Sequence, residues 1–252
     1  MESEQLLFDD GEHKCIAFHF DDETMQESFL ALNQYLIIHN NKAILLDPGS
    51  KDIFDTLADA ISRYINIENL EYIFLSHQDP DVADSIAQWM IATPAKVVIS
   101  SVWMRFITHY GLLDMSRILP FSDEGGTIKL GDSLLEVIPA HFLHSSGNFS
   151  LYDTYAKTLF SGDIGASVSP LYGDSTQDFE SLKPYMQDFH ERYMAGNIFC
   201  RAWVKNVRKL DINMIAPQHG NILDKDASAQ FLDWFEALRC GGDLVEKLYG
   251  QA

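Results

Sequence analysis

Four apolar, β-like segments of this 252-residue chain each run into a short loop that presents His or Asp. The loops begin at His77, His141, Ser161 and Gln218. Strands that end at the same edge of a sheet bring their loops together, and such an edge is a usual place for a functional site. The chain is therefore expected to fold into sheets whose strand ends converge.

Each half of the chain is rich first in predicted strands and then in predicted helices. Asn40-Asn41 is the predicted two-residue turn of a hairpin. Two mixed β-sheets packed face to face, with helices outside, satisfy this order in one domain over 1–252. The predicted strands are 15–20, 34–39, 42–46, 72–75, 96–99, 127–130, 134–139, 149–153, 158–160 and 212–216, and the predicted helices are 53–65, 84–91, 102–109, 178–193, 196–209 and 227–249.

The net charge of −19 argues against partners that carry phosphate. A nucleic acid or an anionic membrane needs a basic protein face. The sequence contains no apolar run long enough to cross a membrane, and its acidic start does not resemble a signal peptide. We therefore expect a cytoplasmic protein, and we expect Cys15, Cys200 and Cys240 to be reduced thiols.

The segment from His77 to Asp81 has metal-binding side chains at alternate positions. Imidazole and carboxylate groups together are a ligand set for first-row divalent metals. Alternating residues cannot all face one ion, so two metals sharing this loop is the natural solution. His-x-Asp alone is most often a hydrogen-bonding turn, and the signal lies in four such loops that each follow a strand.

This joint pattern resembles the metallo-β-lactamase superfamily, over nearly the whole chain. Asp47-Pro48-Gly49 matches the early Asp-containing turn of that superfamily, and the segment from Ser76 to Asp81 lies where its members carry His-x-His-x-Asp-His. The resemblance implies an αββα sandwich, of the α/β (α+β) class, with a two-metal site at the sheet edge.

Two departures indicate which branch the chain resembles. Hydrolases of the superfamily have His at the positions of Asp79 and Val82. An acidic residue at the first of these is a mark of the flavodiiron branch, whose motif reads His-x-Glu-x-Asp-His. The segments 142–145 and 192–195 also look like that branch. The chain is most similar to the stand-alone oxygen-binding diiron proteins of the branch.

The resemblance implies two iron ions with a bridging oxygen species. The first iron takes His77, Asp79 and His144, the second takes Asp81 and His219, and Asp163 bridges them. Val82 cannot act as a ligand, so the second iron keeps open positions that can admit a gas. The metal ligands implied by the resemblance are His77, Asp79, Asp81, His144, Asp163 and His219.

Charge balance is consistent with this site. Two ferrous ions carry four positive charges, and three aspartates with a bridging hydroxide carry four negative ones. Oxidation of both ions adds two positive charges, which a bound peroxide balances, so no net charge is buried. Two zinc ions balance the first state equally well.

Three functions follow from the resemblance, and whether the protein is an enzyme stays open. The first is a non-haem diiron protein that binds dioxygen (diferrous to diferric-peroxo) for oxygen sensing or delivery. The second is a diiron O₂ or nitric oxide reductase that receives electrons from a separate flavoprotein. The third is a dinuclear zinc hydrolase, in which the metals generate hydroxide. The residues at positions 79 and 82 disfavour the hydrolase.

No phosphate-cradling motif is visible, so we expect neither FMN nor a flavodoxin-like domain in this chain. A reductase would then need an external electron donor, and a sensor would need a signalling protein. The resemblance also implies a homodimer.

Other residues are given weaker roles. Tyr193 could hydrogen-bond to bound oxygen, and His141 could support a ligand. Asp47 is interpreted as fixing a turn below the site. The remaining residues considered are interpreted as structural or core, namely His13, His19, His39, His109, His190, Phe142, Leu143 and Trp203.

Overall fold

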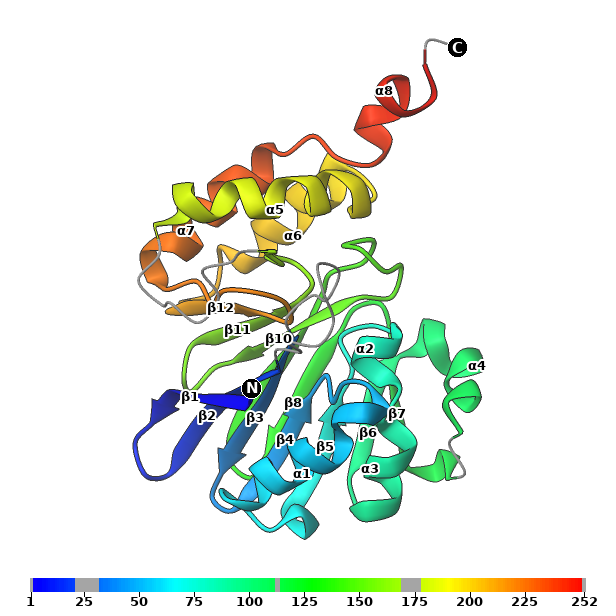
Figure 1. The fold of residues 1–252 in the computed structure, drawn as a ribbon, viewed down its shortest axis with the longest axis vertical. Helices are drawn as coiled ribbons and strands as arrows, with labels where there is room; N and C mark the ends of the chain where they lie inside the picture. Colours follow the sequence, from blue (N-terminus) through cyan, green and yellow to red (C-terminus); the bar gives the residue numbers. More distant parts are fainter. Residues whose placement is uncertain (1, 21–31, 112–113, 169–177, 251–252) are drawn as a thin grey trace.

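Two β-sheets lie face to face between two layers of helices (Figure 1). The computed structural model describes residues 2–20, 32–111, 114–168 and 178–250. Both sheets are mixed, which confirms the predicted αββα sandwich. In Figure 1, α5, α6 and α7 cover the outer face of one sheet, and α1 and α3 cover that of the other.

The first sheet has seven strands in sequence order. Its first four strands are antiparallel and its last three run parallel to β4. The turn between β3 and β4 is the predicted Asn40-Asn41 turn, and both residues have positive φ. The strands are β1 (Glu2–Asp9), β2 (His13–Phe20), β3 (Leu32–His39), β4 (Lys42–Leu46), β5 (Leu70–Phe74), β6 (Lys96–Ser100) and β7 (Ile118–Phe121).

The second sheet has five strands in the order β12-β11-β10-β9-β8. All its neighbours are antiparallel except β11 and β12, which are parallel. The strands are β8 (Gly126–Leu130), β9 (Ser133–Pro139), β10 (Phe149–Asp153), β11 (Thr158–Gly162) and β12 (Met214–Pro217).

Alternation along the strands divides the core into three layers. Along β2, Ile16 and Phe18 pack against helices, whereas Cys15 and Ala17 face the second sheet. Every described helix except the last packs apolar side chains onto the outer faces, whereas the last, Val245–Tyr249, has no buried residue. The helices are α1 (Phe54–Ser62), α2 (Pro80–Ala83), α3 (Ile86–Ala92), α4 (Met104–Ile107), α5 (Phe179–Tyr193), α6 (Asn197–Val207), α7 (Lys225–Ala237) and α8 (Val245–Tyr249).

Several element boundaries differ from the prediction. The helix predicted over 227–249 is two helices, because a Gly241-Gly242 pair lies between α7 and α8, and Gly241 has positive φ. The helix predicted over 102–109 is reduced to α4 between 3₁₀ turns. Strands β1 and β7 were not predicted. Both are edge strands, one rich in polar residues and the other containing Pro120.

The three cysteines are free thiols, as expected. Cys200 and Cys240 bring their sulfur atoms within 3.7 Å of each other in the core under α6.

Among the described residues, no helix is both long and apolar enough to span a membrane.

Candidate metal centre

The predicted ligands lie at one edge of the sandwich, on loops and, for Asp79 and Asp81, at the start of helix α2. His77 follows β5, His144 lies between β9 and β10, and Asp163 follows β11. His219 follows β12, next to the start of β3 at Leu32. Hydrogen bonds join the loops: Ser145 Oγ donates to Gln78 Oε1 at 2.6 Å, and the Gln218 N–H donates to the Gly162 carbonyl at 2.8 Å.

One side of the Asp163 carboxylate faces three of the predicted ligands. Its Oδ2 lies 2.8 Å from His144 Nε2 and 3.6 Å from His77 Nε2. Asp79 Oδ2 lies 3.7 Å from His77 Nε2 and 3.6 Å from His144 Nε2. These four side chains surround one position where a cation can bind.

The other side of the same carboxylate faces the remaining two predicted ligands. Asp163 Oδ1 lies 3.5 Å from His219 Nε2, which in turn lies 3.3 Å from Asp81 Oδ2. The structure thus brings all six side chains together. It divides them into two groups that share Asp163, in the division that the resemblance implied.

Buried polar atoms without partners show that the residues fit a pair of cations. Among the described residues, His77 Nε2 and Asp163 Oδ1 are buried and have no hydrogen-bond partner. A buried polar atom without a partner costs free energy. Metal ions in the two positions would satisfy both atoms and would offset the charge of the three aspartates.

The electrostatics favour an ionised Asp163. Burial alone would raise the pKa of this carboxyl, but His77, His219 and the hydrogen bond from His144 hold it well below its usual range. The same balance between burial and His219 lowers the pKa of Asp81. Both carboxylates are therefore negative and available to a cation at neutral pH.

Asp47 fixes the turn under the centre, as predicted. It is buried with positive φ, and its Oδ1 accepts a 2.7 Å hydrogen bond from the Ser76 N–H. Burial raises the pKa of Asp47 to about 6. Ser76 Oγ lies 2.9 Å from His77 Nδ1, so it fixes the orientation of that ring and leaves Nε2 facing Asp163.

The loop of His219 is held by the first sheet. Asn33, buried in β3, donates from Nδ2 to the Pro217 and Gly220 carbonyls at 2.9 Å each. His19 lies 2.7 Å from the other end of the Asn33 side chain. This role of Asn33 was not predicted, although an Asn at the start of an apolar strand is a signal that could have indicated it.

The loop of Asp163 is held by α5. His190 was expected to be structural, and its Nε2 accepts a 2.9 Å hydrogen bond from the Gly165 N–H. Its Nδ1 lies 2.7 Å from the Met186 carbonyl. Because both ring nitrogens are used in this way, the ring is neutral, and burial lowers its pKa to about 4.

Two aromatic rings of α5 cover His144. The Tyr193 ring lies 5.7 Å from the His144 ring, centroid to centroid, and stacks on Phe189 at 4.8 Å. Tyr193 is 57% exposed, so it lies on the solvent side of His144.

His141 lies apart from the ligands, with its Nε2 2.8 Å from the Asp123 carbonyl.

Leu143 and Trp203 are buried as expected, but Phe142 is not a core residue. It is 42% exposed and lies against Phe199 at the surface. Its backbone has positive φ. Val82 is fully buried in the core beside α3, so position 82 carries an apolar side chain that cannot act as a ligand.

A family model described as "ODP family beta lactamase" matches residues 30–220. Among solved structures, the apo state of the chemotaxis sensor ODP from T. denticola is 42% identical to this chain. That match covers 98% of this chain and 99% of the sensor, with a TM-score of 0.89. A second structure at 42% identity is described as the peroxy diiron species of chemotaxis sensor ODP.

More distant relatives include flavodiiron proteins. A mutant of the flavo di-iron protein from Thermotoga maritima matches with a TM-score of 0.78 at 20% identity. That match covers 94% of this chain and 61% of the mutant, and it shows the shared fold alone. The flavo-diiron protein FprA2 of Clostridium acetobutylicum is 25% identical over 82% of this chain.

The chain spans about half the length of the curated relatives it matches. It covers 53% of FprA2 and 48% of an uncharacterized protein of Methanocaldococcus jannaschii, to which it is 29% identical over 75% of its own length. The family model matches well over half of the chain, and the ODP sensor is similar along almost all of it. The chain belongs to the ODP family of β-lactamase-fold proteins.

Proposed function

We propose that this chain is a non-haem diiron protein that binds dioxygen, and that its role is oxygen sensing. The observation that carries the proposal is the position of Asp163 between two groups of imidazole and carboxylate ligands. The 42% identity to a protein described as a chemotaxis sensor favours sensing over delivery.

In this proposal His77, Asp79 and His144 bind the first iron. Asp81 and His219 bind the second, and Asp163 bridges both. Three carboxylates and three imidazoles make a site of hard and intermediate ligands, which suits iron. Asp79 stands where the zinc hydrolases have a histidine, so the first position has one carboxylate more and one imidazole fewer than a zinc hydrolase site.

The chain's own residues prepare the centre for a cation pair. In this proposal Ser76 Oγ accepts a hydrogen bond from His77 Nδ1–H, which leaves the Nε2 lone pair free for a metal. Asn33 and His190 hold the loops of His219 and Asp163 through backbone groups. The site is therefore supported from both sheets and from α5.

Val82 provides room for a gas at the second position. Its buried valine side chain cannot coordinate, so that position has one imidazole and two carboxylates. When bound, two ferrous ions supply the electrons for reversible dioxygen binding. Phe189 and Tyr193 cover His144 and limit access of water to the first position.

Anaerobic loading followed by exposure to air tests the proposal. The protein is loaded with ferrous iron without oxygen, its iron content is measured, and air is then admitted while the visible spectrum is recorded. We expect two irons per chain and a long-lived charge-transfer band. Asp188→Ala, which removes an exposed carboxylate of α5, is the matched control and should behave as the wild type.

Other outcomes identify the competing functions. A band that bleaches rapidly while oxygen is consumed would indicate a reductase fed by an external donor. Two zinc ions per chain and no spectral response to air would overturn both iron functions. The single-domain organisation, the homodimer and a signalling partner stay predictions, to be checked by mass measurement in solution and by binding assays.

A further inference from the structure

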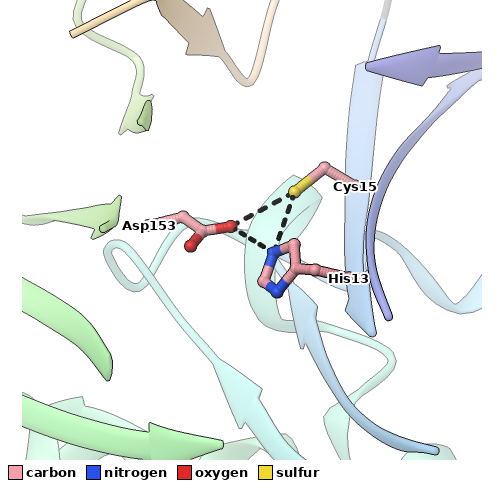
Figure 2. A group of neighbouring side chains, drawn as sticks. All are labelled: His13, Cys15 and Asp153. Carbon is pink, nitrogen blue, oxygen red and sulfur yellow. Dashed lines mark hydrogen bonds and ion pairs between the residues drawn. The ribbon is translucent and has the colours of Figure 1, made fainter. Parts of the chain in front are cut away.

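A second cluster of metal-binding side chains lies between the two sheets, away from the candidate metal centre. His13 and Cys15 occupy alternate positions of β2, so both side chains point toward the second sheet. Asp153 ends β10 and points back between the sheets (Figure 2). All three residues are fully buried. We refer to His13, Cys15 and Asp153 as the inter-sheet cluster.

The cluster is at the opposite edge of the sandwich from the candidate metal centre. His39, the last residue of β3, pairs with His13, whereas Leu32 at the start of β3 pairs with His219. A strand of eight residues spans roughly 23 Å at about 3.3 Å per residue. The two groups therefore cannot share an ion.

The three ligand atoms have nearly the spacing of a metal site. Asp153 Oδ2 lies 2.7 Å from His13 Nε2 and 3.2 Å from Cys15 Sγ, and the sulfur lies 3.6 Å from His13 Nε2 (Figure 2). Zinc binds nitrogen and oxygen at about 2.0–2.2 Å and sulfur at about 2.3 Å. Only a small spreading of the ligands would admit an ion between them.

The hydrogen bonds behind His13 also call for a cation. A chain of contacts runs from Asp153 to His13, from His13 Nδ1 to His39 Nδ1 at 3.1 Å, and from His39 Nε2 to Asp132 at 2.8 Å. Each of these three contacts needs one proton between its two atoms. Two neutral imidazoles carry only two N–H groups, so one contact lacks a proton unless a further cation is present.

Charge balance favours a divalent ion as that cation. With the ion at Asp153, His13 Nδ1–H donates to His39 and His39 Nε2–H donates to the exposed Asp132, so every contact is satisfied. A divalent ion with one thiolate, one carboxylate and a neutral imidazole has no net charge. The ion takes the place of two protons, one from the thiol and one from the chain of contacts.

The thiol is otherwise inert in this position. Burial raises the pKa of the Cys15 thiol, and the neighbouring Asp153 raises it further. A thiolate here therefore needs a positive partner, and metal coordination is the usual one.

We propose that His13 Nε2, Cys15 Sγ and Asp153 Oδ2 bind one divalent ion of the zinc class, with a water molecule completing a tetrahedron. Cysteine, histidine and carboxylate are the ligands that zinc prefers. The ion would join the two sheets directly, since two ligands come from β2 and one from β10. The proposal does not depend on the function proposed for the other centre.

The test uses cobalt as a spectroscopic probe in the full chain. Asp163→Ala first removes the bridging ligand of the other centre. We expect this variant to bind one Co²⁺ with a near-ultraviolet thiolate charge-transfer band, and to bind Zn²⁺ in competition. Cys15→Ser and Asp153→Asn, each added to Asp163→Ala, should abolish the band and the bound ion. Cys200→Ala is the matched control, because it removes a buried thiol from another part of the core, and it should leave the band unchanged.

A stability measurement accompanies the spectrum. A chelator should lower the Tm of the Asp163→Ala variant and leave the Tm of Asp163→Ala with Cys15→Ser unchanged. His39→Gln removes the support of the ring, so it should keep the band but weaken the affinity for Co²⁺ by roughly 10- to 100-fold.

Two results would overturn the proposal. One is the absence of both a thiolate band and a chelator effect in the Asp163→Ala variant, which would mean that a proton, not a metal, completes the cluster. The other is a bound ion that remains in both the Cys15→Ser and the Asp153→Asn variants.

Discussion

The candidate metal centre and the inter-sheet cluster use the same kinds of side chain but are built differently. Most side chains of the first lie on loops after strands, with Asp81 in the short helix α2, and hydrogen bonds to backbone groups hold those loops. Side chains of the second belong to strands themselves, so the sheet pairing fixes them directly. Loops adjust more readily than paired strands when an occupant changes. The difference favours a reactive role for the first and a structural one for the second.

The largest expected effect is a loss of metal from the candidate metal centre and not from the inter-sheet cluster. Asp163→Ala removes the carboxylate that both ligand groups share, so the candidate metal centre should fall from two irons per chain to none. Metal analysis after anaerobic loading checks this. Retention of two irons would show that Asp163 is not the bridge.

Asp153→Ala should act on folding rather than on iron. It leaves His13 and Cys15 buried without the carboxylate that both contact, and a buried polar group left without its hydrogen-bond partner costs about 1–3 kcal/mol. Chemical denaturation measures the free energy of unfolding, with iron content as the second readout. Asp132→Ala is the control: its carboxylate is mostly exposed, so we expect a much smaller change in the free energy of unfolding than for Asp153→Ala. Equal effects of the two variants would contradict the assignment of a buried pair.

The next effect is the pH dependence of stability that comes from His190, which supports the candidate metal centre. Its folded pKa of about 4 lies below the usual histidine pKa of 6.5. Between these values the unfolded chain binds a proton that the folded chain does not, so stability is lost as pH falls from 7 toward 4. The loss approaches about 3 kcal/mol.

Denaturation of the metal-free protein at several pH values measures this contribution. The stability advantage of the wild type over His190→Gln should shrink by that amount as the solution is acidified. An advantage that stays constant with pH would refute the account of His190.

The smallest expected effect concerns the open position of the candidate metal centre. Val82→His supplies a further imidazole, so it should weaken oxygen binding by roughly tenfold, or about 1.4 kcal/mol. Oxygen titration of the ferrous protein measures this. Val82→Leu fills the same space without a nitrogen and should bind oxygen nearly as the wild type does. Unchanged affinity in Val82→His would show that position 82 does not limit coordination.

Sequence reasoning located the candidate metal centre because its side chains follow strands in a repeated pattern. The position of Asp163 between two ligand groups could be inferred from the resemblance, but not the bonds that hold its loop. His190 lies in a helix far along the chain, and only packing of α5 brings it to Gly165. The resemblance implied a role for each ligand, which local patterns alone did not.

The inter-sheet cluster was missed for a physical reason. His13 and Cys15 alternate along a strand, which indicates a shared face, but nothing in the sequence shows which strand of the other sheet lies opposite. Asp153 is 138 residues further along from Cys15. His13 and His39 were therefore interpreted as structural, one residue at a time. The edge strands β1 and β7 were missed because polar residues and Pro120 weaken their patterns.

Helix α5 also has a mechanical consequence. Its last turn and a half contacts the candidate metal centre twice, through the Tyr193 and Phe189 rings on His144 and through the His190 ring on the backbone after Asp163. These two ligands come from different loops, yet one rigid rod of 15 residues rests on both. A change in the spacing between His144 and Asp163 would therefore act on the contacts at one end of a single helix. The C-terminal end of α5 connects two ligand loops to the outer helical layer.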